Sequence, residues 1–158
     1  MDVIEYQKKY KQDFIRLNTA WVEKYFIMEE TDREILSNTD DFIQKGGMIY
    51  FAVENDQVLA TCMTIPEDDY TWEILKLAAD DRYSGHGAGS EVFKACMDYA
   101  IAHGAKKLTL ISNHILKPAL HIYEKFGFRQ VEVDRTEYER CDVQCEYIVP
   151  VNKTKINE

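Results

Sequence analysis

The stretch Ser84-Gly85-His86-Gly87-Ala88-Gly89-Ser90 decides the fold of this chain. It follows an apolar, strand-like run at residues 74–79 and precedes a helix-like segment at residues 90–103. Three glycines at alternate positions leave backbone N–H groups free to point into one concavity, and the following helix adds the positive end of its dipole. The stretch therefore predicts a phosphate-binding loop. Glycines alone also fit a plain tight turn, so the rest of the chain must decide.

Size and composition predict one globular domain over residues 1–158. The net charge of −9 argues against direct nucleic-acid binding, which needs a basic face, and is compatible with a cationic substrate or with solubility alone. No apolar run approaches the roughly 20 residues of a membrane span. The N-terminal residues MDVIEYQKK contain no apolar signal core. We therefore expect a cytoplasmic protein that binds neither membrane nor nucleic acid.

The cysteines and histidines do not predict a metal site. The four cysteines form no CxxC pair and lie in apolar or strand-like surroundings, at Cys62, Cys96, Cys141 and Cys145. Such cysteines are typical of small buried hydrophobic residues. The four histidines show no metal-ligand spacing either. We expect no bound metal and no redox function.

The pattern of apolar residues predicts an α/β protein with a mixed sheet. Strands are expected at residues 3–6, 48–53, 58–65, 71–79, 107–112, 128–133 and 141–149, and helices at 11–26, 31–38, 90–103 and 119–126. Thr31 and Glu34 have the spacing of a capping box for the second helix. A helical crossover joins strands 71–79 and 107–112, so these two should run parallel. The order predicts a central mixed sheet with helices on both faces.

Four stretches together resemble the GNAT superfamily of acyl-CoA-dependent N-acetyltransferases. They are EILKLAADDRYSGHGAGSEVF (residues 73–93), LTLISN (108–113), PALHIYEKFGF (118–128) and YERCDVQCEY (138–147). The resemblance covers residues 48–149, and residues 21–36 look like a bacterial branch sometimes attached to MarR-type regulators. It implies the GNAT fold, acetyl-CoA as cosubstrate without a metal, and direct transfer of acetyl to a primary amine of a small molecule or peptide.

The family's phosphate loop, Gln/Arg-x-x-Gly-x-Gly/Ala, fits this chain in two frames. Arg82-x-x-Gly85-x-Gly87 is a literal match. Ser84-x-x-Gly87-x-Gly89 lacks the Gln/Arg but places the apolar face of the helix better, and we favour it. In that frame the resemblance implies that backbone amides from His86 to Ser90 surround the pyrophosphate. The expected cofactor contacts in this loop are Ser84, Gly85, His86, Gly87, Ala88, Gly89 and Ser90.

Two residues match the family's catalytic positions. Glu73, at the start of the central strand, corresponds to the general base of the histone-acetyltransferase branch. A carboxylate in an apolar cleft has a raised pKa and can accept the proton of the amine, directly or through water. Tyr123 corresponds to the general acid that protonates the departing thiolate. The alternatives are a Glu73 that is solvated or paired with Lys76, and a Tyr123 that is only a core aromatic.

Further contacts follow from the resemblance with less support from the residues themselves. In the family a bulge near Leu77, Ala78 and Ala79 separates this strand from its parallel neighbour and frees amides for the pantetheine and the acetyl carbonyl. Asn113 is expected either to contact the cofactor or to serve as a turn residue. Glu29 and Asp32 are candidate anchors for a cationic amine, although acidic residues are more often a solvated surface.

Two further classes of function compete with the enzyme. A non-catalytic acyl-CoA-binding module would keep the glycine loop but would not need Glu73 or Tyr123, and both are present. A nucleotide-binding domain is disfavoured because no GxxxxGK[ST] motif occurs and the loop does not open a βαβ unit. We therefore expect an N-acetyltransferase, either a monomer or a homodimer.

Overall fold

The computed structural model describes residues 1–83 and 85–151. In this part of the chain one sheet has the strand order β1-β2-β3-β4-β5-β7-β6. The strands are β1 (Asp2–Glu5), β2 (Met48–Glu54), β3 (Gln57–Pro66), β4 (Thr71–Ala79), β5 (Lys107–Ser112), β6 (Arg129–Val131) and β7 (Val143–Ile148). Neighbouring strands run antiparallel except for β4 and β5, which are parallel. The mixed sheet is therefore confirmed.

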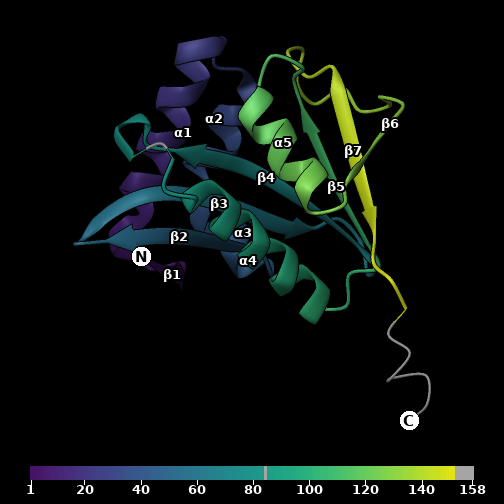
Figure 1. The fold of residues 1–158 in the computed structure, drawn as a ribbon, viewed down its shortest axis with the longest axis horizontal. Coiled ribbons are helices and arrows are strands. Elements are labelled where there is room, and N and C mark those ends of the chain that lie inside the picture. Colours follow the sequence, from purple (N-terminus) through teal and green to yellow (C-terminus); the bar gives the residue numbers. More distant parts are fainter. Residues whose placement is uncertain (84, 152–158) are drawn as a thin grey trace.

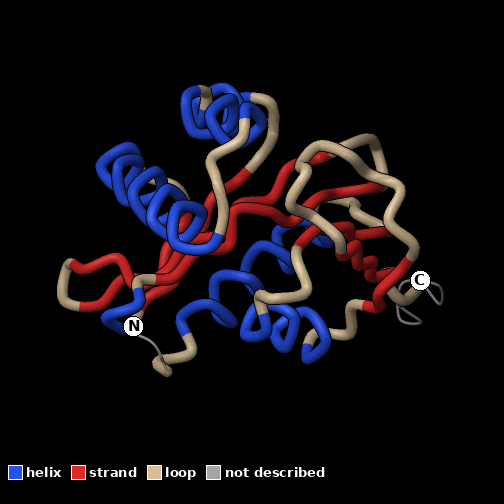
Figure 2. The backbone as a smooth tube through the Cα atoms, turned by 90° about the horizontal axis from the view of Figure 1, so that it is seen from above, coloured by secondary structure: helices blue, strands red, loops and turns tan. Residues whose placement is uncertain are grey.

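Helices cover both faces of the sheet (Figure 2). The helices are α1 (Lys11–Tyr25), α2 (Glu30–Ser37), α3 (Thr39–Gln44), α4 (Ala88–Ala102) and α5 (Lys117–Lys125), with short 3-10 turns at Lys8–Tyr10 and Asp81–Tyr83. Figure 1 shows α4 and α5 in front of the sheet and α1 to α3 behind it. The sheet has a buried core on each side, so this is the layered α/β architecture that the sequence predicts.

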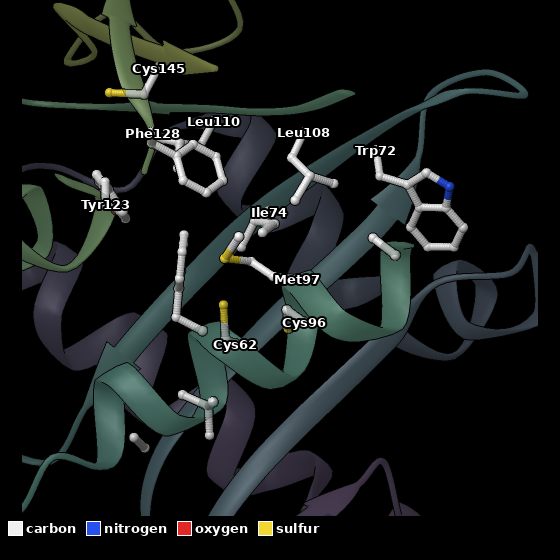
Figure 3. Packing of buried hydrophobic residues seen from close by; sticks show 14 of the residues in the cluster. Cys62, Trp72, Ile74, Cys96, Met97, Leu108, Leu110, Tyr123, Phe128 and Cys145 are labelled. Atoms are coloured by element: carbon white, nitrogen blue, oxygen red, sulfur yellow. The ribbon is translucent and has the colours of Figure 1, made fainter. Parts of the chain in front are cut away.

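The core beneath α4 and α5 is built around aromatic rings. Phe93 of α4 lies 5.3 Å from the ring of Tyr123, 5.8 Å from Phe126 and 5.4 Å from Phe128. Figure 3 shows Tyr123 and Phe128 beside Leu110 of β5 in this layer. Because Phe93 and Tyr123 are packed together, the core itself fixes the position of the Tyr123 ring.

The second core lies between the sheet and the N-terminal helices. Phe14 and Leu17 of α1 are almost fully buried against Ile49 and Phe51 of β2. The cysteines follow the expectation for buried hydrophobic residues at three positions, while Cys141 is partly exposed. The two cores hold β4 between them, so both sets of helices can place side chains around this strand.

Helix α2 begins differently from the prediction. Its N-cap is Glu29, and the side chains of Glu29 and Asp32 form the capping box, so the pairing of Thr31 with Glu34 was wrong. The side chain of Thr31 instead donates a hydrogen bond to the carbonyl of Glu137 at 2.8 Å. Asp32 is the third residue of the helix, and its exposed fraction is 0%, so its side chain points into the protein.

The other element boundaries agree with the sequence to within a few residues. β4 and β5 have the expected bounds, whereas α4 begins at Ala88 instead of residue 90. β6 and β7 are shorter than predicted, which leaves a longer connection between them. We call residues 132–142 the β6–β7 loop.

Candidate active site

The central strand β4 carries a β-bulge where the candidate site lies. Met63 of β3 is opposite Leu75 and Thr61 is opposite Ala78, so Lys76 and Leu77 together oppose a single residue of β3. Lys76 has φ +57, a left-handed conformation that is uncommon for residues other than glycine. The bulge therefore includes Leu77, one of the three positions expected from the family resemblance, and begins one residue earlier, at Lys76.

Beyond Glu73 the strands β4 and β5 separate. Their parallel pairing has only three residue pairs, the last being Glu73 with Thr109. Figure 1 shows the two strands diverging from a common edge, with α5 in front of the gap. A cleft of about 320 Å³ lies here. Its lining includes residues 73–79 of β4, Gly89 and Phe93 of α4, residues 111–113, and Ala119, Ile122 and Tyr123 of α5.

The cleft has a predominantly aromatic wall opposite α5. Trp21, Tyr25 and Phe26 come from α1 and its C-terminal end, and Tyr138 comes from the β6–β7 loop. A wider hollow of about 620 Å³ adjoins it, because Tyr138 and Cys141 line both spaces. The walls of the cleft therefore include residues of α4 as well as residues of the β6–β7 loop.

The glycine loop ends in a helix N-terminus. Gly85 and Gly87 have φ of +85 and +76, and an added Cβ at either would meet no atom within 4 Å. Both glycines are therefore needed for backbone conformation and not for close contact. Gly87 is the N-cap of α4, so the unpaired amides of the first turn follow it directly.

The remaining loop residues are placed as follows. Ser84 lies outside the described residues. His86 is exposed and its ring lies edge-on to that of Tyr83, whereas Ala88 is buried and Ser90 is half-buried in the first turn of α4. Arg82, which the literal frame would use, donates hydrogen bonds to Asp80. The guanidinium of Arg82 is thus paired within the chain, and the frame that begins at Ser84 stays a prediction.

Glu73 lies in the wall of the cleft where β4 and β5 separate. Its side chain is 9% exposed, and its Oε2 accepts a hydrogen bond at 3.0 Å from Arg135 of the β6–β7 loop. Burial raises the pKa of Glu73 to about 7, and the charge of Arg135 opposes that rise. The ion pair expected with Lys76 as an alternative is absent among the described contacts of Glu73, because Arg135 takes this position.

Tyr123 lines the same cleft from α5 and is 8% exposed. Burial raises its pKa above the ordinary value, with a smaller opposing effect of a hydrogen bond with Ser112. Its hydroxyl is therefore protonated at neutral pH, which is the state that a general acid must have before it reacts. The structure thus brings Glu73 and Tyr123 into the lining of one cleft, together with Leu77, Ala78, Ala79 and Gly89.

Asn113 also lines the cleft, and both polar atoms of its side chain are hydrogen-bonded within the chain, one locally and one to the β6–β7 loop. Its Nδ2 donates to the carbonyl of Arg140 at 2.6 Å, and its Oδ1 accepts from the amide of Ile115 at 2.9 Å. This is the turn role that the sequence left open. Any contact with a cofactor would use the backbone or the apolar part of the residue.

Asp32 and Glu29 are already engaged with other residues of the chain. Asp32 is fully buried and is bound by Lys76 at 2.5 Å and by Arg140 at 2.6 and 2.7 Å. Burial alone would raise the pKa of Asp32, but the hydrogen bonds from Arg140 and Lys76 lower it to about 2. Glu29 accepts a hydrogen bond from the amide of Glu139 at 2.8 Å. This arrangement argues against the expectation that the two carboxylates anchor a cationic substrate.

Sequence reasoning did not select three basic residues of this region. Arg135 and Arg140 reach the site from the β6–β7 loop, and Lys76 enters it only because of the bulge. Arg140 also lies over the ring of Tyr138, at 4.4 Å from its centre. No local pattern indicates these contacts, since the partners are between 44 and 108 residues apart.

Residues 1–83 and 85–151 contain no group of three or more His, Cys, Asp or Glu side chains arranged to hold a metal ion. No helix in these ranges is both long and apolar enough to cross a membrane.

Comparison with known proteins defines the family. The model of the acetyltransferase (GNAT) family matches residues 14–128, so the chain belongs to the GNAT acetyltransferase family. Human N-acetylaspartate synthetase is 28% identical over 65 residues, which is 41% of this chain and 22% of that protein. The rat protein of the same name matches to the same extent. The match therefore spans 22% of the length of these curated relatives.

Solved structures of similar fold cover nearly the whole chain. A GNAT-family acetyltransferase from Staphylococcus aureus Mu50 has a TM-score of 0.83 at 17% identity, covering 93% of this chain and 98% of that one. An acetyltransferase from Streptococcus agalactiae has a TM-score of 0.80 at 19% identity, covering 94% and 98%. A putative acetyltransferase from Salmonella typhimurium, solved with its cofactor acetyl-CoA, has a TM-score of 0.75 at 15% identity, covering 96% and 95%. At these identities the likeness establishes the GNAT fold.

Proposed function

We propose that the chain transfers the acetyl group of acetyl-CoA to a primary amine by direct attack. The observation that carries this proposal is the cleft between β4 and β5, which has Glu73 where the strands separate and both Tyr123 and Gly89 along its length. The family membership and the structural neighbour solved with acetyl-CoA support the choice of cosubstrate. The names of the human and rat relatives, which make N-acetylaspartate, support an amino group as acceptor.

The glycine loop and the start of α4 are assigned to the pyrophosphate. Gly85 and Gly87 turn the backbone so that the free amides of the first turn of α4 face outward. These amides and the helix dipole favour a dianionic group. The backbone of Leu77, Ala78 and Ala79, which lines the cleft after the bulge, is assigned to the pantetheine arm and to polarising the acetyl carbonyl.

The reaction needs a neutral amine and a protonated leaving group. A lysine-like amine has a pKa of about 10.4 in water, so a base must take its proton. Glu73, whose pKa is raised to about 7, suits this role directly or through water. The nitrogen then forms a bond to the carbonyl carbon, the C–S bond breaks, and Tyr123 gives its proton to the departing sulfur. The amide nitrogen loses its second proton to solvent, Glu73 releases the first, and Tyr123 is reprotonated from solvent, so one proton is released overall. The acceptor is a small-molecule or peptide amine.

A panel of amines tests this proposal. The purified protein is mixed with acetyl-CoA and each amine in turn, and the free thiol of CoA is measured. We expect thiol release that depends on one class of amine, and we expect calorimetry to detect binding of CoA. Binding without turnover on any amine would favour a non-catalytic acyl-CoA-binding module. Failure to bind CoA or its acyl esters would overturn the proposal altogether.

A further inference from the structure

Lys76 is a buried amine inside the cleft assigned to the thioester. It lies three residues beyond the last β4–β5 pair, at the bulge, and its side chain is 3% exposed. The left-handed backbone at φ +57 turns it out of the regular alternation of the strand. Lys76 lines the same cleft as Glu73, Leu77 and Tyr123. The chain therefore carries a primary amine of its own on a residue that lines the cleft assigned to the thioester.

The surroundings of Lys76 allow its nitrogen to lose a proton. Asp32 of α2 accepts a hydrogen bond from Lys76 Nζ, but its charge is also balanced by two hydrogen bonds from Arg140 of the β6–β7 loop. A neutral Lys76 therefore leaves no buried carboxylate without a cation. The other groups that face it are the ring of Tyr138, 5.1 Å from Nζ, and the thiol of Cys141.

The hydrogen bond to Asp32 also orients the nitrogen. A neutral amine that donates one N–H to Asp32 keeps its lone pair available for attack. Burial lowers the pKa of Lys76, while the hydrogen bond with Asp32 opposes this effect. Lys94, by contrast, is exposed on the surface of α4, where it pairs with Asp98, and it does not line the cleft. Lys76 thus differs from Lys94 in its burial and in the direction of its pKa shift, which is downward for Lys76 and upward for Lys94.

We propose that Lys76 is a self-acetylation site, at which the enzyme transfers acetyl from bound acetyl-CoA to its own Nζ. This inference rests on the proposed function, because it uses the same bound thioester. The Nζ–carbonyl bond forms and the C–S bond breaks. Of the two protons that the ammonium loses, one leaves on CoA as its thiol and the other goes to solvent. The product amide is uncharged and occupies the cleft, so acetylation of Lys76 slows turnover of the external amine.

Mass spectrometry of the intact chain tests this inference. The protein is incubated with acetyl-CoA in the absence of an amine, and the mass gain and its position are followed by peptide mapping. We expect one acetyl group on Lys76 in the unaltered protein, formed at a first-order rate that does not change with protein concentration. Desulfo-CoA, which fills the site without an acetyl group, should suppress the label, and higher pH should accelerate it.

Matched variants separate this site from chemical acetylation. Lys76→Arg should abolish the label while keeping a cation beside Asp32, and Lys94→Arg should leave the label unchanged. Label on exposed lysines alone, or a Lys76 label that persists with desulfo-CoA, would overturn the inference. If amines turn over but Lys76 stays unlabelled, the inference fails while the proposed function stands. If CoA does not bind at all, the proposed function itself fails.

Discussion

At the scale of single residues, two opposing effects set the pKa of the candidate base, Glu73. Burial raises the pKa of Glu73, and Arg135 lowers it. Arg135 lowers the pKa of Glu73 less than an isolated cation would, because it also pairs with Glu67 at 3.3 Å and with Glu137 at 2.8 Å. The result is a carboxyl group with a pKa of about 7, which changes charge near neutral pH, as a general base must.

Replacing Glu73 by Gln should change the pH dependence of acetyl transfer. In the unaltered protein we expect kcat/KM to rise with pH and level off above about pH 7, because the ionised carboxylate is the active form. Glu73→Gln should lower kcat by about 10²-fold and remove this acidic limb, the usual effect of losing a general base. A pH–rate profile with the acidic limb unchanged would show that another group is the base.

Replacing Tyr123 by Phe should affect chemistry more than binding. The ring is held by Phe93, so the variant keeps the core contacts and loses only the hydroxyl. We expect kcat to fall by about 10²-fold, with the affinity for CoA close to that of the unaltered protein. Steady-state kinetics together with calorimetry measure both quantities. Unchanged turnover with every accepted amine would exclude Tyr123 as the acid.

The sequence predicted these two residues and not their partners. Glu73 and Tyr123 could be selected because each lies in a short motif of the family. Arg135 is 62 residues from Glu73 along the chain, so only the folded β6–β7 loop brings the two together. The choice of Asp32 as a substrate anchor did not foresee that Lys76 would bind Oδ1 of its carboxylate and that Arg140 would bind both Oδ1 and Oδ2.

At the scale of elements, the glycine loop depends on backbone conformation. Gly87 and Gly104 offer a matched comparison, because both have positive φ and both have open space where a Cβ would be added. Gly87 precedes α4 at the candidate pyrophosphate site, whereas Gly104 follows the C-cap of the same helix. An alanine would therefore be strained in the same way at either position, and the two positions differ in whether they lie at the candidate site.

Substitution by alanine should separate stability from binding. Gly87→Ala and Gly104→Ala should each lower the free energy of unfolding by about 1 kcal/mol, since alanine is strained in the left-handed region. Only Gly87→Ala should also weaken CoA binding, because it shifts the first amides of α4. Urea unfolding and calorimetry measure the two effects. Equal CoA affinity in both variants would argue against a role of the loop in binding.

Elements were predictable where apolar periodicity and glycine signals agree. β4 and β5 have the predicted bounds, and the crossover helix between them fixes their parallel direction. The start of α2 was not predictable in the same way, because Thr31 is the more common N-cap residue and Glu29 was chosen by its tertiary contacts. The bulge at Lys76 has no glycine to mark it, so its position followed only from the family resemblance.

At the scale of the whole molecule, Asp32 links three parts of the chain. It belongs to α2 and binds Lys76 of β4 and Arg140 of the β6–β7 loop. Removing one member of a buried ion pair leaves the other charges uncompensated, which costs far more than the loss of a surface pair. The Lys94–Asp98 pair on α4 is such a surface pair and serves as a control.

Asp32→Asn should therefore lower the free energy of unfolding at neutral pH by about 3–5 kcal/mol. Asp98→Asn should change it by less than about 0.5 kcal/mol. The native pKa of Asp32 is lowered from 3.8 to about 2, so its contribution is present above pH 3.8 and is lost as the pH falls through 2. Urea unfolding of both variants at neutral and acidic pH tests this. Similar losses in the two variants would contradict it.

The short β4–β5 pairing makes the middle of the sheet a seam. Four strands lie on one side of it and three on the other, and only three residue pairs connect the two halves directly. A ligand bound in the cleft between β4 and β5 would contact both halves and connect them. Without a ligand, β4 and β5 should open locally more often than the other strand pairs. Binding of CoA should therefore slow hydrogen exchange at the amides of residues 74–79 more than exchange in the β2–β3 hairpin.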